Sequence, residues 1–219
     1  MTLRRSAPTS TLQDETYLKL RHWLSVGRFM PGERLKIKQL ATELGVGLMP
    51  VRAALQRLAA ESALVNVPNC GVTVPQLSRL EFDDVLQMRL MLEGEAAERG
   101  ARQLHAAEHQ ELIRLGGEME EAIKEGDLKR YLAANDTFHV VLYRAARSPL
   151  LLDLIETVWL RIGPISNRVH DDPHVWGSMN DAHKDLLAAL ARKDPPAARR
   201  AIERDLFNAG QYLKQCCVA

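Results

Sequence analysis

The sequence predicts a mainly α-helical protein, in which three short helices and a β-hairpin precede an antiparallel bundle of about six longer helices. Apolar residues recur at helical spacing along most of the 219 residues and alternate with polar ones over Ala63–Gln76. Aromatic residues make up only 5% of the chain, whereas helix-forming Ala, Leu, Arg and Glu are frequent. Both the spacing and the composition therefore favour helix over sheet.

Three short helices are predicted before residue 61. The first spans residues 12–26 and is followed by the Pro-Gly turn of MPGERL. The second spans residues 37–44, and Gly45 then occupies the position where a left-handed residue ends a helix. Pro50 falls in the first turn of the third helix, where proline is tolerated, and that helix runs to about Ala60.

The hairpin is predicted from ALVNVPNCGVTVPQ, Ala63 to Gln76, with Pro68-Asn69-Cys70-Gly71 at its tip. Three short helices followed by one hairpin make the layout of a winged helix-turn-helix. In that fold a later helix enters the major groove of DNA, and the hairpin, or wing, lies along a neighbouring groove.

The rest of the chain is predicted to be entirely helical. A long amphipathic helix starts at Ser78 or Arg79, and no strand pattern recurs after Pro75. Gly and Pro residues mark the breaks, at Gly126-Asp127, Ser148-Pro149, Gly163-Pro164 and Asp194-Pro195. The later helices are expected at about 106–125, 128–146, 149–162, 174–192 and 195–215. We therefore predict a lead-in over residues 1–11, a winged helix-turn-helix domain over 12–76 and a helical domain over 77–219.

The net charge of +1 is unevenly distributed. Residues 1–78 contain ten Lys and Arg and five Asp and Glu, a net charge of +5, and the remainder carries −4. A basic first third suggests that this part binds a polyanion. The three cysteines form no disulfide framework, the N-terminus has no apolar signal segment, and no apolar run approaches the roughly 18 residues of a membrane span. The expected location is the cytoplasm.

Two parts of the chain resemble one family. The segment PGERLKIKQLATELGVGLMPVRAALQRLAAESALVNVPNCGVTV is similar to the winged-helix domain of GntR-type bacterial transcription regulators. QMRLMLEGEAAERGA, NDTFHVVLYRAARSPLL and AHKDLLAALARKDPPAARRAIERDL resemble the helical FCD domain, which binds ligands, of its FadR branch. The resemblance covers about residues 12–215. It implies a homodimeric repressor or activator that binds a pseudo-palindromic DNA operator and responds to a small organic acid.

The resemblance also assigns residues to DNA contact. Lys38 and Arg52 keep the basic chemistry of the family, and Arg52 can reach a guanine edge or a phosphate. Leu48 and Met49 replace a polar run, so they either contact thymine methyl groups or are merely tolerated near the groove. In both cases fewer hydrogen-bonded base contacts are expected. The candidate DNA-binding residues are Arg34, Lys38, Gly47, Leu48, Met49, Arg52, Asn69 and Gly71.

A divalent transition metal, zinc or nickel, is implied in the helical domain. Many members of the FadR branch place an Asp or Asn four residues before a His, a second His on a later helix, and a His or Asp 22 residues after that. Here the matching residues are Asn135, His139, His183 and Asp205. Two imidazoles, a carboxylate and an amide oxygen suit such a metal and leave positions for water or effector. Asp136 is an alternative to Asn135.

Arg89 is the candidate effector-binding residue, because the resemblance places an Arg here that pairs with a carboxylate of the effector. The alternative is an ordinary salt bridge to Glu93, four residues later, worth roughly 0.2–0.5 kcal/mol.

Two other functions remain as alternatives. One is the same fold without metal, sensing a fatty acyl or other apolar effector. The other is a helical metal-dependent hydrolase using His170 and Asp171, within VHDDPH, Val169 to His174. That segment lies between two prolines in a predicted loop, and no nucleophile or phosphate cradle accompanies it.

Overall fold

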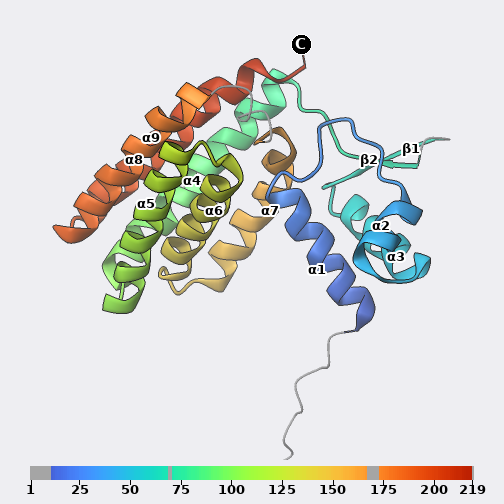
Figure 1. Cartoon of the computed structure of the whole chain (residues 1–219), viewed down its shortest axis with the longest axis horizontal. Coiled ribbons are helices and arrows are strands. Elements are labelled where there is room, and N and C mark those ends of the chain that lie inside the picture. Colours follow the sequence, from blue (N-terminus) through green and yellow to red (C-terminus); the bar gives the residue numbers. More distant parts are fainter. Residues whose placement is uncertain (1–10, 69–70, 167–172, 219) are drawn as a thin grey trace, which may run out of the picture.

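The protein consists of a small N-terminal domain with a two-stranded wing and a larger helical domain (Figure 1). The computed structural model describes residues 11–68, 71–166 and 173–218, with backbone only for 173–179. Two separate clusters of buried hydrophobic residues form the cores of the two domains. The predicted fold class is therefore confirmed.

The N-terminal domain begins with α1, Leu12–Ser25, whose first turn is closed by a capping box between Thr11 and Asp14. Helices α2, Ile37–Leu44, and α3, Leu48–Ala60, follow as predicted. Strands β1, Val65–Val67, and β2, Gly71–Thr73, pair antiparallel. The tip residues Asn69 and Cys70 lie outside the described ranges.

The helical domain is built on α4, Arg79–Gln103, which packs against α6, α7 and α9. A capping box between Ser78 and Glu81 starts α4 at the predicted position. Within the described ranges five further helices follow, so the predicted number of about six is confirmed. They are α5 (Ala106–Glu125), α6 (Leu128–Arg144), α7 (Pro149–Ser166), α8 (Pro173–Ala191) and α9 (Pro195–Gln215).

One predicted helix break is wrong. Helix α7 does not stop before Gly163-Pro164 but continues to Ser166 with Pro164 inside it. Proline removes one helical hydrogen bond, but Gly163, Pro164 and Ile165 are all buried, so tertiary packing maintains the helix. The predicted loop at Val169–His174 also needs correction, since Pro173 and His174 belong to α8, whereas 169–172 lie outside the described ranges.

The two domains meet where α1 lies beside α7 (Figure 1). Leu160 of α7 is buried in the hydrophobic cluster of the N-terminal domain. Gly163 allows close approach: a Cβ there would lie 2.1 Å from the carbonyl oxygen of Leu24 in α1. Arg21 of α1 and Glu156 of α7 form an ion pair with an N–O distance of 2.8 Å. The junction thus combines backbone contact, apolar burial and one ion pair.

Candidate DNA-reading surface and buried His-His-Asp cluster

The turn between α2 and α3 is built from glycine. Gly45 adopts φ +67° and its N–H bonds carbonyl groups at the end of α2, which closes that helix. Gly47 precedes the first residue of α3, and Pro50 lies within its first turn, where no helical hydrogen bond is lost. Val51 and Leu55 face the domain core, which leaves the opposite side of α3 to solvent.

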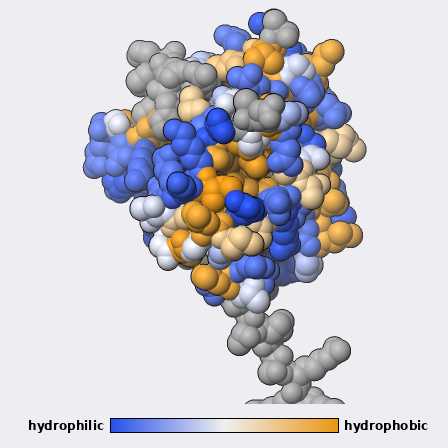
Figure 2. Space-filling view, turned by 90° about the vertical axis from the view of Figure 1, so that its right-hand side faces the viewer, coloured by the Kyte–Doolittle hydropathy of each residue, from blue (hydrophilic) through white to orange (hydrophobic). Residues whose placement is uncertain are grey.

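The predicted DNA-binding residues within the described ranges lie on the surface of this domain. Leu48 and Met49 are 46% and 66% exposed at the start of α3, and Arg52 is exposed one turn further on. Figure 2, which views the end of the molecule that carries this domain, shows hydrophobic patches among strongly hydrophilic ones. Lys38 is exposed on α2, and Gly71 begins β2 with φ +83°.

The basic residues predicted to bind DNA differ from other basic residues of this domain in having no carboxylate partner. Arg21, Arg28 and Arg57 each pair with a carboxylate. Arg34, Lys38 and Arg52, by contrast, form no ion pair with any residue that the structure describes. The backbone of Arg34 bridges to Thr73, which holds this residue beside the wing. Their charge is therefore available to an external anion.

In the helical domain, His139, His183 and Asp205 lie far apart in the sequence but close together in space. They come from α6, α8 and α9, and all three are buried. The Nε2 atoms of the two histidines lie 3.2 Å apart, and His139 Nε2 lies 3.4 Å from an oxygen of Asp205. One ligand atom from each residue falls within 4.8 Å of the others, an arrangement that can hold a metal ion.

A buried polar chain orients His139. The Tyr143 hydroxyl donates to Glu93 over 2.9 Å, so its oxygen can accept from His139 Nδ1, also at 2.9 Å. Burial and Glu93 raise the pKa of Tyr143 well above its usual value, which keeps the hydroxyl protonated. The proton of a neutral His139 is then on Nδ1, and the lone pair of Nε2 points toward His183 and Asp205.

Burial also keeps His139 uncharged. It lowers the pKa of His139 to about 3, and the nearby carboxylate of Asp205 only partly opposes this effect. A neutral imidazole with a free Nε2 is the form that binds metals. The three side chains therefore fit a divalent transition metal in geometry, and His139 fits one in its protonation as well.

Arg89, which is half-buried, forms an ion pair with the buried Glu93. Arg89 Nε and Nη2 donate to the two carboxylate oxygens of Glu93 over 2.6 and 3.3 Å. The salt bridge weighed from the sequence is present, but it is part of the polar chain to His139 and not an exposed pair. The sequence reasoning missed Tyr143 as a member of this chain, although its position four residues after His139 was a usable signal.

The two alternatives for the fourth ligand lie on different faces of α6. Asn135 is half-buried one turn before His139, on the same helix face. Asp136 instead lines a pocket between α1, α6 and α7. The carboxylate of Asp136 does not belong to the cluster of His139, His183 and Asp205, and Asn135 stays the candidate for the fourth ligand. A second cavity, of about 200 Å³, lies between α5 and α8 and is lined by Asn180 and His183.

Comparison with known proteins agrees with this architecture. Residues 12–74 match the model of bacterial regulatory proteins of the gntR family, and residues 84–208 match the FCD domain. The HTH-type transcriptional regulator McbR of Escherichia coli is 33% identical over 194 residues, 88% of this chain and 87% of McbR. The chain belongs to the GntR family. It is a GntR regulator with an FCD domain, so it is a DNA-binding transcription regulator and not an enzyme, and the hydrolase alternative is wrong.

Other similar proteins support the assignment of this chain to the GntR family. The solved structure of E. coli McbR/YncC superimposes with a TM-score of 0.88 at 30% identity, covering 95% of this chain and 99% of that one. A probable D-xylose utilization operon transcriptional repressor of Paenarthrobacter nicotinovorans is 28% identical, covering 91% of this chain and 86% of the repressor. None of the helices described is long and apolar enough to cross a membrane.

Proposed function

We propose that this regulator binds a pseudo-palindromic operator as a homodimer, represses transcription, and responds to a small carboxylate bound beside a divalent metal. The observation that carries the metal part is the convergence of His139, His183 and Asp205 from three helices, with His139 fixed by Tyr143. The named repressors among its relatives support repression. The expected site of action is the cytoplasm.

DNA binding is assigned to the exposed cations and to the tip of α3. Arg52 lies one turn into α3, past Leu48 and Met49, and has no acidic partner in the part of the chain that the structure describes. An unpaired guanidinium there can bind a guanine edge or a phosphate bidentately. Arg34, Lys38, Gly47 and Gly71 supply further contacts at the wing and at α2 and α3. Asn69 completes the proposed set from outside the described ranges.

Replacing Arg52 tests this assignment. A duplex selected from a random pool by the wild-type protein serves as the probe, and gel shift gives its affinity. Arg52→Ala should weaken binding by about 1–3 kcal/mol, roughly 5- to 150-fold, because a bidentate contact is lost. Arg192→Ala is the matched control, since Arg192 is exposed at the end of α8, away from α3. If both variants bound the duplex with equal affinity, the proposal that α3 reads the DNA would be contradicted.

A dimer follows from the operator symmetry that we propose. Met88 and Met91 on α4 and Phe207 on α9 are 39%, 60% and 50% exposed, and α4 packs against α9. Large apolar side chains exposed on adjacent helices are typical of surfaces that a second subunit covers. Light scattering on the wild type and on Arg52→Ala should give the same dimeric mass.

The metal would be held by His139, His183 and Asp205, with Asn135 as the fourth ligand. Two imidazoles and one carboxylate favour zinc or nickel, and the metal would supply a Lewis-acidic position for a carboxylate of the effector. Arg89 is the proposed partner for the effector because Nη1 is not used in the two bonds to Glu93. An apolar acyl effector would need an apolar cavity, whereas both cavities described above carry charged side chains.

Metal content discriminates these possibilities. Elemental analysis of purified protein should find about one zinc or nickel ion per chain, and His183→Ala should reduce it to background because one of two imidazole ligands is lost. Asn135→Ala should weaken metal retention, whereas Asp136→Ala should not. Metal at background in the wild type would favour the metal-free alternative. Loss of metal in Asp136→Ala but not in Asn135→Ala would show that Asp136 is the fourth ligand.

A further inference from the structure

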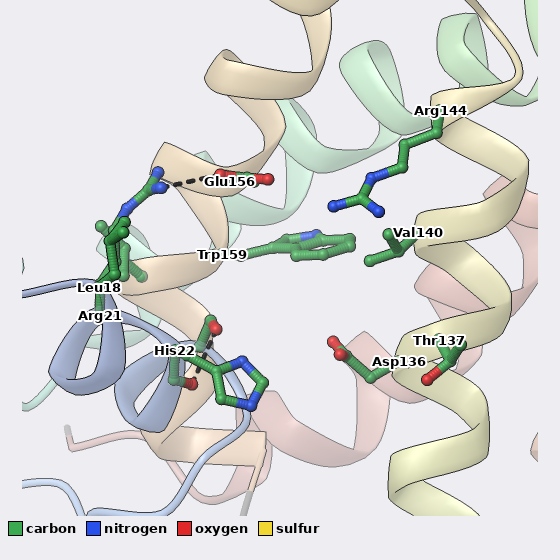
Figure 3. Close-up of a pocket in the computed structure, with 11 residues that line it drawn as sticks. Leu18, Arg21, His22, Asp136, Thr137, Val140, Arg144, Glu156 and Trp159 are labelled. Atoms are coloured by element: carbon green, nitrogen blue, oxygen red, sulfur yellow. Dashed lines mark hydrogen bonds and ion pairs between the residues drawn. The ribbon is translucent and has the colours of Figure 1, made fainter. Parts of the chain in front are cut away.

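The pocket between α1, α6 and α7 that Asp136 lines is a cavity at the junction of the two domains, and none of the His-His-Asp residues lines it. It has a volume of about 300 Å³ and opens between α1, α6 and α7 (Figure 3). Arg21 and His22 come from α1, Asp136 and Arg144 from α6, and Trp159 from α7. A space of this size is at the lower end of the range for small-molecule pockets. Its walls belong to both domains, so a ligand there would touch both.

Two residues that line this cavity carry a buried donor without a hydrogen-bond partner among the described residues. In the described ranges, buried side-chain N and O atoms without a hydrogen-bond partner are Arg21 Nε, Trp159 Nε1, Asn180 Oδ1 and His183 Nδ1. The first two belong to residues that line this junction. Buried N–H groups almost always have a hydrogen-bond partner. Both atoms are donors, so a ligand that carries an acceptor, such as a carboxylate, could bond to either of them.

Arg144 supplies a positive charge at one end of this cavity. Arg144 forms no ion pair with any residue that the structure describes, and its guanidinium points from α6 toward the cavity, which Trp159 also lines (Figure 3). Glu156 is already paired with Arg21. The charge of Arg144 is therefore not neutralised by any carboxylate that the structure describes.

The remaining lining is apolar. Trp159 lies across the middle of the cavity in Figure 3, with Val140 beside it and Leu18 on the α1 side. An aromatic face and two aliphatic side chains can hold the hydrocarbon part of a ligand. We propose that this junction binds a small organic carboxylate, whose charge pairs with Arg144 and whose apolar body lies against Trp159.

Such a ligand would connect the two domains. Trp159 also contacts Tyr143, with ring centroids 6.0 Å apart, and Tyr143 is hydrogen-bonded to His139. One side of the junction is formed by α1 of the DNA-binding domain. On the other side, Trp159 is separated from His139 by the ring of Tyr143 alone. This site is distinct from the effector position proposed beside the metal, and its occupant would fix the position of α1 against α7.

Ligand-observed fluorine NMR tests the site with 4-fluorobenzoate, in EDTA so that no metal can hold the probe. The wild type should broaden the 4-fluorobenzoate signal at low millimolar concentration. Arg144→Gln should weaken binding by about tenfold or more, because the charge-assisted contact is lost. Val140→Trp should also abolish binding by filling the cavity. The neutral 4-fluorobenzamide should bind the wild type about tenfold more weakly.

Arg192→Gln is the matched control, since it removes an exposed charge far from the junction, and it should bind like the wild type. Circular dichroism checks that each variant is folded. The proposal is overturned if the wild type does not broaden the probe, if Arg144→Gln binds as well as Arg192→Gln, or if benzoate and benzamide bind alike. Displacement of the probe by inorganic phosphate as readily as by unlabelled benzoate would also overturn it, since the apolar part would then not matter. Because metal is absent throughout, none of these outcomes bears on the metal-linked effector site.

Discussion

At the scale of single residues, some members of the site could be proposed from their spacing in the sequence, and others only from the fold. His139, His183 and Asp205 could be proposed from the sequence because their spacing resembles that of a known family, and the structure brings all three together. Glu93 could be connected only to Arg89, four residues away on the same helix. Its bond to Tyr143 links positions 50 residues apart, and no local pattern predicts such a contact.

Tyr143→Phe tests whether this polar chain sets the form of His139. Removing the hydroxyl leaves His139 Nδ1 and one oxygen of Glu93 buried without this partner. The free energy of unfolding should fall by about 1–3 kcal/mol in chemical denaturation. Affinity for zinc, measured by competition with a chromophoric chelator, should fall by roughly 10- to 100-fold, as is common for residues that orient a ligand. Unchanged zinc affinity would show that Tyr143 does not position His139.

At the scale of elements, helix ends were predictable where a capping residue or a glycine marks them. Ser78 begins α4 and Gly126 ends α5 as the sequence suggested. Gly163-Pro164 gave the same local signal but lies inside α7, because burial against α1 outweighs the lost hydrogen bond. A local rule cannot include a contact made by a segment more than 130 residues away.

The start of α4 carries a pH-dependent contribution. The Ser78 backbone N–H and hydroxyl donate to Glu81, and these bonds lower the pKa of Glu81 below 4.5. A carboxylate with a lowered folded-state pKa stabilises the protein above its unfolded value of 4.5, and this stability is lost as the pH falls through the folded value. Glu81→Gln should therefore be less stable than wild type at pH 7, and the difference should shrink toward pH 3. A constant difference in thermal unfolding across this range would contradict the assignment.

At the scale of the whole molecule, two domains were predictable but their contact was not. The change from a short-helix and hairpin pattern to long amphipathic helices, together with the charge asymmetry, separates the two parts of the sequence. Nothing in the sequence shows that Leu160 of α7 completes the core of the other domain, since its apolar spacing fits either core. The junction cavity, which this packing creates, was likewise beyond sequence reasoning.

Gly163→Ala tests how tightly the domains are joined. The added methyl group would meet the carbonyl oxygens of Leu24 and Ser25 at 2.1 and 2.6 Å, so α1 and α7 must separate. We expect the free energy of unfolding to fall by about 1–3 kcal/mol, as for other overpacked sites. Gly117→Ala in α5 is the control, because nothing lies within 4 Å of its Cβ position, and it should be neutral or slightly stabilising. If both variants had the same stability, the junction would be looser than its geometry indicates.

The exposed apolar tip of α3 has a thermodynamic consequence for the proposed operator complex. Contacts from Arg34, Lys38 and Arg52 to phosphates release counterions, so they weaken as salt rises. Burial of Leu48 and Met49 releases no ions but removes apolar surface from water, which makes the heat capacity change of association more negative. Compared with a regulator whose reading tip is basic, this protein should therefore keep more of its DNA affinity as ionic strength increases.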